Sequence, residues 1–241
     1  MTRLLVSVRS VPEALTAGRG GADFIDLKEP GQGALGGLLP GVIRAIVAAL
    51  RADGIALPVS ATIGDLPMQA LGEIRHRVAA VAACGVDIVK VGIVDEPGAA
   101  DVLQALAGCG HAVVPDFVAD RGIPRALVEQ ALGLGFAGVM ADTADKRAGS
   151  LFEVVAGKAL RRFVAGAREA RVMVGLAGAL RLADLPALVA LEPDFAGFRS
   201  AVCAGDRRGA LDAARLQTLV DTMHRMRRDI AAEPAQAFGG R

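Results

Sequence analysis

Short apolar runs alternate with longer helix-forming segments eight times along the 241 residues of the chain. Each run is followed by Gly, Asp, Pro or Ser, the residues that most often turn the backbone. Parallel strands that are buried on both faces have this appearance in a sequence. We expect strands at residues 4–8, 24–28, 59–63, 88–91, 112–114, 138–142, 172–177 and 195–198.

Eight repeats of one strand and one helix predict an α/β fold, a single-domain (β/α)8 TIM barrel, in preference to an open doubly wound sheet. No change in composition marks a second domain. Residues 1–230 are therefore expected to form the barrel domain, and residues 231–241 a flexible C-terminal tail. The helices are expected to begin near Pro12, Pro40, Met68, Gly98, Pro124, Ser150, Asp184 and Asp212.

The composition limits the partners that the chain can have. Hydrophobic residues make up 53% of the chain, which is enough to bury a large core. A formal charge of +1 and the absence of Trp and Tyr leave neither the basic field nor the stacking surface that nucleic-acid binding needs. The longest charge-free stretch, residues 30–43, is interrupted by glycines and prolines and is shorter than the about 20 apolar residues of a membrane span. We expect no nucleic-acid partner and no membrane segment.

Cysteine and histidine residues are few and scattered. The 3 cysteines are widely spaced, which suggests neither a disulfide framework nor a zinc site. His76 and His224 lie on expected helices and His111 precedes the fifth expected strand, so none has the spacing of a metal ligand. The first expected strand begins almost at Met1, which leaves no room for a signal peptide. The sequence predicts a cytoplasmic protein without a metal site.

Ionisable residues collect where the expected strands end, which is the end of a TIM barrel at which active sites are built. These residues are Asp26, Lys28, Lys90, Asp142 and Lys146. Any one of them alone would more often be a solvated loop residue or part of a structural ion pair. Because three strands would direct Lys or Asp toward one small space, a shared site is the better interpretation of the set.

The alternation of side chains along a strand sharpens this interpretation. Asp26 and Lys28 are two residues apart and must share a face, with Leu27 on the other side. Lys90 lies between two valines, which would face the helices and direct the lysine inward. Crowded ammonium groups depress one another's pKa, which frees an amine to act as a nucleophile or base near neutral pH. The lysines therefore predict Schiff-base chemistry on a carbonyl substrate.

Two glycine-containing segments follow the seventh and eighth expected strands, "GLAGALR" and "GFRSAV". Loops at these positions of a TIM barrel commonly bind phosphate through backbone N–H groups, although tight turns alone would also explain the glycines. Gly178, Arg199 and Ser200 are the candidates. Arg207 and Arg208, in the next loop, are expected to contact either a substrate phosphate or a neighbouring subunit.

Three further expectations concern the loops at the barrel mouth. Ser60 and Asp65, within and after the third expected strand, are candidates for substrate contacts. Glu29 should point away from Asp26 and Lys28 because of the strand alternation. Residues 115–124, "PDFVADRGIP", are expected to form the loop after the fifth strand.

Taken together, several motifs resemble those of the (5-formylfuran-3-yl)methyl phosphate synthase family over nearly the whole chain. They are "LLVSV", "GGADFIDLKEPGQGALG", "VSATIGD", "DIVKVG", "MADTADKRAGSLF", "GLAGAL" and "GFRSAVCAGDR". The resemblance implies a TIM-barrel lyase that condenses two molecules of glyceraldehyde 3-phosphate into a furan aldehyde phosphate, with loss of phosphate and water. It also implies a place in the biosynthesis of methanofuran or a related one-carbon cofactor, and the Ala-, Gly- and Arg-rich composition suggests a bacterial member.

The resemblance implies a role for each lysine and aspartate of the site. Lys28 would form the Schiff base, and Lys90 would be an acid or base. Asp142 and Lys146 match the "DTA.K" motif of the family, while Asp26 would position or deprotonate groups near Lys28. After an iminium forms on Lys28, an enamine would attack the second aldehyde, and phosphate elimination and ring closure would follow. This scheme requires no metal and no organic cofactor.

Two other functions are compatible with the same residues. A class I aldolase acting on a small sugar phosphate would share the lysine, the barrel and the phosphate loops. A non-catalytic barrel that binds a sugar phosphate would use the lysines only as phosphate contacts. In each case the partner is a small phosphorylated molecule, here a triose phosphate, and the apolar outer helices favour a homo-oligomer.

Overall fold

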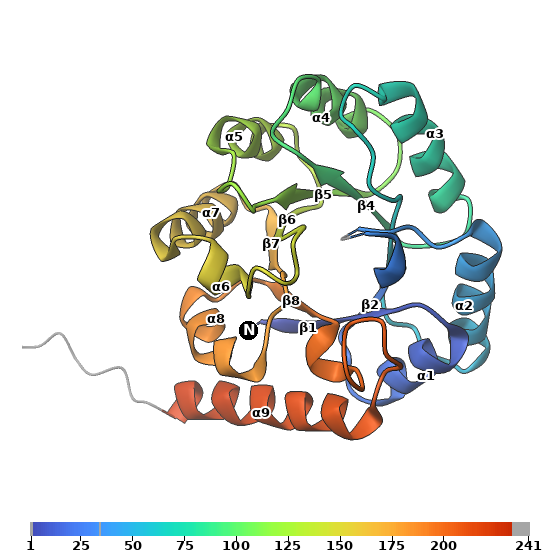
Figure 1. Ribbon diagram of the computed structural model, residues 1–241, viewed down its shortest axis with the longest axis vertical. Helices are drawn as coiled ribbons and strands as arrows, with labels where there is room; N and C mark the ends of the chain where they lie inside the picture. The colour runs from blue at the N-terminus through green and yellow to red at the C-terminus, as the bar shows by residue number, and fades with distance from the viewer. Residues whose placement is uncertain (1, 34, 233–241) are drawn as a thin grey trace, which may run out of the picture.

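The computed structural model describes residues 2–33 and 35–232, which form a closed barrel of eight parallel strands (Figure 1). Each strand pairs with the next one along the chain, and the eighth pairs with the first. The predicted TIM barrel is confirmed. The strands are β1 (Arg3–Val8), β2 (Phe24–Leu27), β3 (Val59–Thr62), β4 (Ile88–Ile93), β5 (Val113–Val118), β6 (Gly138–Asp142), β7 (Met173–Leu176) and β8 (Phe195–Phe198).

A ring of helices surrounds the strands (Figure 1). It comprises α1 (Val11–Arg19), α2 (Pro40–Ala52), α3 (Leu71–Ala82), α4 (Ala99–Ala107), α5 (Arg125–Gly133), α6 (Leu151–Val154), α7 (Gly157–Glu169), α8 (Leu185–Leu191) and α9 (Ala213–Ala232). Short 3-10 helices η1 (Pro30–Gln32), η2 (Leu182–Asp184) and η3 (Ser200–Val202) lie in the loops. In the described part of the chain, no helix is long and apolar enough to cross a membrane.

The helices begin close to the positions that the sequence predicts. The structure differs from the prediction in one helix that is divided and in the end of the last helix. The helix expected from Ser150 is divided into α6 and α7, and Ser150 forms a capping box with Glu153 at the start of α6. The last helix, α9, continues to Ala232 and packs against α1 and α8. The first residues of the expected tail are therefore helical, and the rest of that tail, 233–241, lies outside the described residues.

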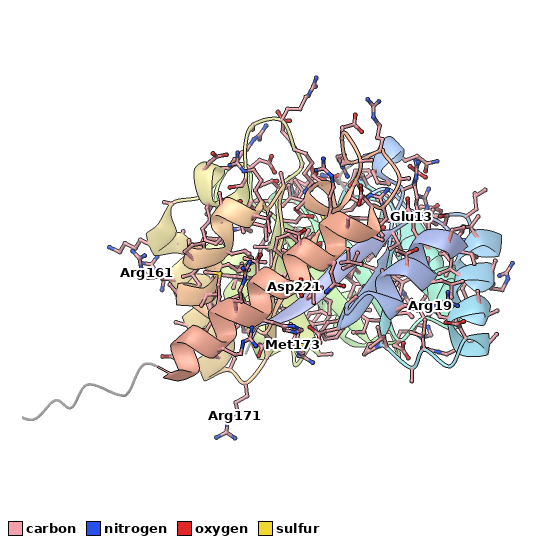
Figure 2. All side chains as sticks on the ribbon, turned by 90° about the horizontal axis from the view of Figure 1, so that it is seen from below. Glu13, Arg19, Arg161, Arg171, Met173 and Asp221 are labelled. Carbon is pink, nitrogen blue, oxygen red and sulfur yellow. The ribbon has the colours of Figure 1, made fainter. Side chains whose placement is uncertain are left out.

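Strands and helices run in opposite directions, so the loops that follow the strands gather at one end of the barrel. Figure 2 shows α1 running from Glu13 at this end to Arg19 at the other, while Met173 marks the end at which β7 begins. The loops that follow β2, β4, β6 and β8 therefore open at the same mouth. This geometry brings together residues that are far apart in the sequence.

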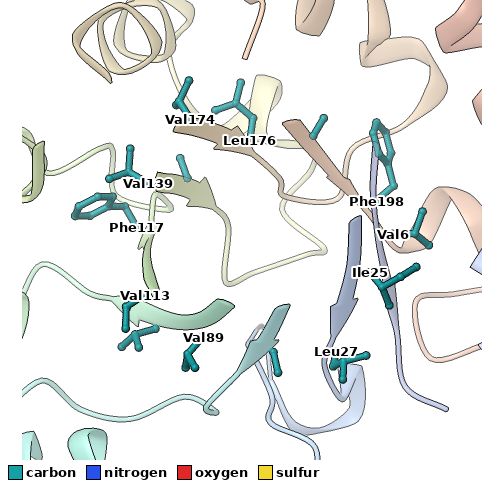
Figure 3. Close-up of a cluster of buried hydrophobic side chains, with 14 of the residues drawn as sticks. Val6, Ile25, Leu27, Val89, Val113, Phe117, Val139, Val174, Leu176 and Phe198 are labelled. Atoms are coloured by element: carbon teal, nitrogen blue, oxygen red, sulfur yellow. The ribbon is translucent and has the colours of Figure 1, made fainter. Parts of the chain in front are cut away.

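Alternate strand residues face outward and form the main core with the helices (Figure 3). Leu27, Val89, Val91, Phe117 and Phe198 are among them, and all are buried. The alternation predicted from the sequence is confirmed, because the neighbours of the inward-facing lysines pack on the outside of the barrel. Burial of apolar surface of this kind stabilises the fold by about 25 cal/mol per Å².

A smaller apolar cluster lies inside the barrel. Its members are Leu5, Phe24, Val114, Met140, Ala177 and Phe195. Gly175 makes room for the Phe195 ring, because a Cβ at position 175 would overlap that ring. Ser60 and Lys90 border a small space shared with this cluster, so the cluster forms the floor of the polar layer above it.

The fifth strand is longer than the sequence predicted. It continues to Val118, whereas Val114 was the expected end, and residues 115–118 are therefore part of the barrel wall. Pro115, which lacks a backbone N–H, usually argues against a central strand and led to the early end. In the structure Pro115 is paired with Val91 of β4, and the next residue, Asp116, faces the interior between Gly92 and Met140.

Candidate active site

Three of the four lysines in the chain lie together at the barrel mouth. Lys28, Lys90 and Lys146 each lie within ion-pair distance of a buried aspartate. The fourth, Lys158, is exposed on α7. The structure therefore brings together the charged residues that the strand ends suggested.

Asp26 organises one half of this cluster. Its Oδ2 accepts a hydrogen bond from the Ser7 hydroxyl at 2.9 Å, and its Oδ1 accepts one from the Ser60 hydroxyl at 2.7 Å. Lys90 Nζ lies 2.8 Å from the same Oδ1. Burial raises the pKa of Asp26, but the charges of Lys90 and Lys28 outweigh it and hold that pKa below its usual value. Asp26 is a fully hydrogen-bonded carboxylate.

Lys90 is closely paired with the Asp26 carboxylate. Only 2% of its surface is exposed, and its Nζ also lies 3.8 Å from the sulfur of Met140. Burial lowers the pKa of Lys90, but the carboxylates of Asp26 and Asp116 outweigh it and raise the pKa above its ordinary value. The expectation that crowded lysines depress one another's pKa is wrong for Lys90, because nearby carboxylates contribute more than nearby ammonium groups.

The pKa of Lys28 is shifted in the opposite direction, below its ordinary value. Its Nζ lies 3.8 Å from Asp142 Oδ2 and 3.9 Å from Asp26 Oδ2, and both distances are longer than a hydrogen bond. Burial lowers the pKa of Lys28, and the charges of Lys90 and Lys146 lower it further, while the two carboxylates offset only part of this effect. Burial is therefore the larger cause, and lysine crowding is a smaller one. The lowered pKa makes Lys28 more easily converted to a neutral amine than Lys90.

Asp142 forms the other half of the cluster. Its Oδ1 accepts hydrogen bonds from the backbone N–H of Thr143, at 2.7 Å, and from Lys146 Nζ. Burial raises the pKa of Asp142, but the charges of Lys146 and Lys28 outweigh it and lower the pKa to about 2. Its Oδ2 has no hydrogen-bond partner in the described ranges and lies nearest to Lys28. This oxygen is placed to act on a group bound to Lys28.

Asp116 is a buried acid in the segment 115–124, which the sequence predicted to be a loop. None of its surface is exposed, and neither carboxylate oxygen has a hydrogen-bond partner among the described residues. Burial and the charge of Asp142 raise the pKa of Asp116 to about 7. An alternating pattern continued through Pro115 would have placed Asp116 on the same face as Val114, but the proline hid that signal.

Gly178 and Ser200 line a small cavity next to Lys28 and Lys146, as expected for loops after β7 and β8. The backbone N–H groups of Gly178 and Ser200 have no acceptor in the part of the chain that the structure describes. Gly178 has a φ of 117°, and a Cβ there would come within 2.9 Å of the Thr143 hydroxyl. Glycine is therefore required where this loop passes the end of β6.

Arg199 lines the same cavity, but its guanidinium is bound to the protein. Its Nη1 and Nη2 donate to the two carboxylate oxygens of Glu13 and to the carbonyl oxygens of Ser7 and Gly209, and its Nε donates to the carbonyl of Arg207. All five N–H groups thus have acceptors. This arrangement does not favour the phosphate contact expected for Arg199. It holds the loop after β8 against α1 and β1.

Ser60 and Asp65 lie away from the cavity next to Lys28. The Ser60 hydroxyl donates to Asp26, so Ser60 positions that carboxylate and is not free to bind phosphate. Asp65 accepts a hydrogen bond from the backbone N–H of Leu35 at 3.3 Å and lines a separate cleft of about 530 Å³ beside α3. Neither position supports the direct contact with substrate or its phosphate that was expected.

A basic cleft of about 610 Å³ opens beside Lys146. Arg147, Arg207 and Arg208 line it, and Asp206 pairs with Arg208 at 3.0 Å. Arg207 lines both this cleft and the smaller cavity next to Lys28. The cleft therefore offers a positively charged approach to the cavity. It includes Arg207 and Arg208, for which the sequence predicted contact with either a substrate phosphate or a neighbouring subunit.

Glu29 does not belong to the lysine cluster. The Glu29 carboxylate accepts a hydrogen bond from the backbone N–H of Gly31 at 2.8 Å and lies 3.7 Å from Arg9, so it does not join the lysines. Within residues 2–33 and 35–232, no group of three His, Cys, Asp or Glu side chains is arranged to hold a metal ion.

A family model and several known proteins match this chain over most of its length, and all carry the same assignment. The family model described as 4-HFC-P synthase matches residues 4–220. The (5-formylfuran-3-yl)methyl phosphate synthase of Methanopyrus kandleri is 35% identical over 92% of this chain and 98% of its own length. The enzyme of the same name from Archaeoglobus fulgidus is 34% identical over 92% of this chain and 99% of its own. A Methylorubrum extorquens protein, provisionally assigned the same activity, is 42% identical over 92% and 91% of the two chains.

Solved structures with a similar fold are more distant in sequence. Phosphoribosyl anthranilate isomerase from Thermus thermophilus has a TM-score of 0.65 at 17% identity and covers 93% of this chain and 100% of its own. A 3-hexulose-6-phosphate synthase has a TM-score of 0.58 at 23% identity, over 91% of this chain and 100% of its own. At these identities the likeness shows the barrel alone.

Proposed function

This chain belongs to the 4-HFC-P synthase family and is an enzyme, and from that premise we propose that it condenses two molecules of glyceraldehyde 3-phosphate through a Schiff base on Lys28. The product is (5-formylfuran-3-yl)methyl phosphate, and mass balance requires the loss of one phosphate and two molecules of water. We place this product in the synthesis of methanofuran or a related one-carbon cofactor.

The observation that carries the proposal is the state of Lys28. It is a buried lysine with a lowered pKa, and it lines a cavity at the barrel mouth. Among the described residues, the carboxylates nearest to its Nζ lie 3.8 and 3.9 Å away, beyond hydrogen-bond distance. A neutral amine attacks an aldehyde carbon, and the resulting carbinolamine loses water to give an iminium ion. The iminium makes the proton on the adjacent carbon acidic, and removal of that proton allows phosphate to leave from the next carbon.

Proton transfers in these steps fall to the groups around Lys28. The unpartnered Oδ2 of Asp142 lies 3.8 Å from Lys28 Nζ, close enough to reach a substrate carbon beside the imine. Lys146 holds Asp142 in its ionised form. Asp26 and Lys90 form a hydrogen-bonded ion pair on the other side of Lys28, where they are suited to stabilise developing charge and to relay a proton.

Phosphate groups have two places to bind in this proposal. The retained phosphate is expected in the cavity with Gly178 and Ser200, whose backbone N–H groups have no acceptor among the described residues and lie near Arg207. The phosphate that leaves is expected in the open basic cleft at Arg147 and Arg208, from which it can escape to solvent. Loops after the seventh and eighth strands of a TIM barrel are common phosphate sites.

The test is incubation with glyceraldehyde 3-phosphate alone, with inorganic phosphate and furan-aldehyde absorbance measured together. We expect both to appear, and borohydride added during turnover should leave a covalent adduct on Lys28. A class I aldolase would give the adduct without releasing phosphate. A non-catalytic barrel would give neither an adduct nor phosphate, and either result would contradict the proposal.

A further inference from the structure

Asp116 stands apart from the other acids of the site. It lies on β5, is completely buried, and forms neither a hydrogen bond nor an ion pair with any described residue. Asp26 and Asp142, in contrast, accept hydrogen bonds and pair with lysines. Burial of a carboxylate without partners is strongly unfavourable, and such groups in folded proteins call for an explanation.

Charged groups face Asp116 from several elements. They are Lys90 on β4, Asp142 on β6, Lys28 at the end of β2 and Lys146 in the loop after β6. Burial and the charge of Asp142 raise the pKa of Asp116 to about 7, and the three lysines offset only part of this rise. Near neutral pH the carboxyl group is therefore present in both its acid and its base form, which is the condition for transferring a proton in either direction.

We propose that Asp116 is the acid–base catalyst of the ring dehydration, a role that rests on the condensation proposed above. When a hydroxyl oxygen closes the ring onto an aldehyde, the product is a hemiacetal, and its new hydroxyl must leave as water. The C–O bond breaks with its electron pair on the departing oxygen, and the proton of the Asp116 carboxyl completes the water molecule. The ring oxygen stabilises the cation that is left.

The second half of the step restores Asp116. Its carboxylate takes a proton from the carbon next to the cation, and the electrons of that C–H bond form a C=C bond of the furan. The carboxyl group thus ends the dehydration in its starting form, and no oxidant or reductant is needed.

The other acids at the mouth are less suited to this step. The pKa values of Asp26 and Asp142 are lowered, because ion pairs with lysines outweigh their burial, and both stay ionised near neutral pH. Lys90 is a poor proton donor, because the Asp26 and Asp116 carboxylates outweigh its burial and raise its pKa. Of the acids in the cluster, Asp116 has the pKa that matches the task.

The test compares Asp116→Asn with the matched control Asp101→Asn, which changes an exposed aspartate in the first turn of α4. Asparagine keeps the shape of the side chain and cannot transfer a proton. Furan formation by Asp116→Asn is expected to fall about 10²- to 10⁴-fold. Borohydride should still trap an adduct on Lys28, and phosphate should still be released. Asp101→Asn should match the unchanged protein.

The pH profile supplies a readout that a purely structural role of Asp116 would not change. In the unchanged protein, furan formation should fall as pH rises through about 7, because the acid form of Asp116 is lost. Asp116→Asn should lack this limb, and Asp116→Glu should keep it at a shifted pH. If circular dichroism shows that Asp116→Asn does not fold, the limb in the unchanged protein and its shift in Asp116→Glu decide the matter.

The experiment distinguishes failure of the proposed condensation from failure of the proposed role of Asp116. If the unchanged protein releases no phosphate and forms no adduct on Lys28, the proposed condensation itself is wrong. If the unchanged protein does both, while Asp116→Asn makes the furan at the full rate or the limb near pH 7 is missing, only the role of Asp116 is overturned.

Discussion

Lys28 and Lys90 share the same barrel mouth and are both buried, yet their pKa values shift in opposite directions. Burial lowers the pKa of each, but the close Asp26 carboxylate, 2.8 Å from Lys90, reverses the effect there. The carboxylates nearest to Lys28 lie 3.8 and 3.9 Å away and do not. Burial alone therefore does not decide which lysine has the lowered pKa; the distance to a hydrogen-bonding carboxylate does.

The largest expected effect follows removal of the lysine with the lowered pKa. Lys28→Met should abolish the borohydride adduct and reduce turnover about 10⁴- to 10⁶-fold, as loss of a nucleophile typically does. Lys158→Met, which changes the exposed lysine of α7, is the control and should keep both. An adduct that persists in Lys28→Met, located by peptide mapping, would assign the imine to another lysine.

Asp26→Asn removes the feature that distinguishes the two lysines. Lys90 would lose its hydrogen-bonded carboxylate, and burial should then lower its pKa, as it does at Lys28. Because an uncompensated charge remains buried, the free energy of unfolding should fall by about 3 to 5 kcal/mol. Urea denaturation measures this, and the Lys28 adduct should survive under native conditions. An unchanged midpoint and slope would show that the pair contributes little.

Proton uptake by Lys28 should make both the rate of imine formation and the stability of the fold depend on pH. Imine formation needs the neutral amine, so its rate should fall about tenfold for each pH unit below the lowered pKa of Lys28 and level off above it. The unfolded chain binds more protons at this position, so Lys28 contributes a stability that rises with pH between its lowered pKa and the ordinary value of 10.5. Rapid mixing followed by borohydride quenching measures the rate. A rate that is independent of pH would contradict a titrating Lys28.

Arg199→Lys tests a charge pair outside the lysine cluster. Lysine offers at most three donors in place of five, so at least two hydrogen bonds to Glu13 and the nearby carbonyls are lost, at a cost of about 3 kcal/mol. Because these bonds hold the loop that carries Arg207, KM should rise more than kcat falls. A fall in kcat at unchanged KM would instead indicate that Arg199 contacts the reacting groups.

The smallest effect is expected in the apolar floor of the barrel. Gly175→Ala would push against the Phe195 ring and should destabilise the protein by about 1 to 3 kcal/mol. The pKa of Lys28 and the yield of its adduct should not change, because the floor carries no charge. A change in the pH profile of Gly175→Ala would show that packing below the site affects the lysines.

The sequence was sufficient to predict the barrel and most of the charged cluster, for reasons that particular residues make clear. The inward face of two strands follows from the sequence alone. Apolar Leu27 separates Asp26 from Lys28, and a valine lies on each side of Lys90, so the charged residues must share the other face. Asp116 was missed because a proline usually marks the end of a strand, whereas β5 continues through Pro115. The binding of Arg199 to Glu13 was not predictable, since the partners are 186 residues apart.

By itself, the sequence determined the number of strand–helix units, the inward face of each strand and the end of the barrel at which the charges gather. These properties depend on local periodicity, which a sequence carries directly. Only the tertiary structure decided which lysine has a lowered pKa, which acid is left without partners and which arginine is already bound. Those outcomes depend on distances of a few ångströms between residues on different strands, and electrostatic energies change steeply over such distances in a buried site.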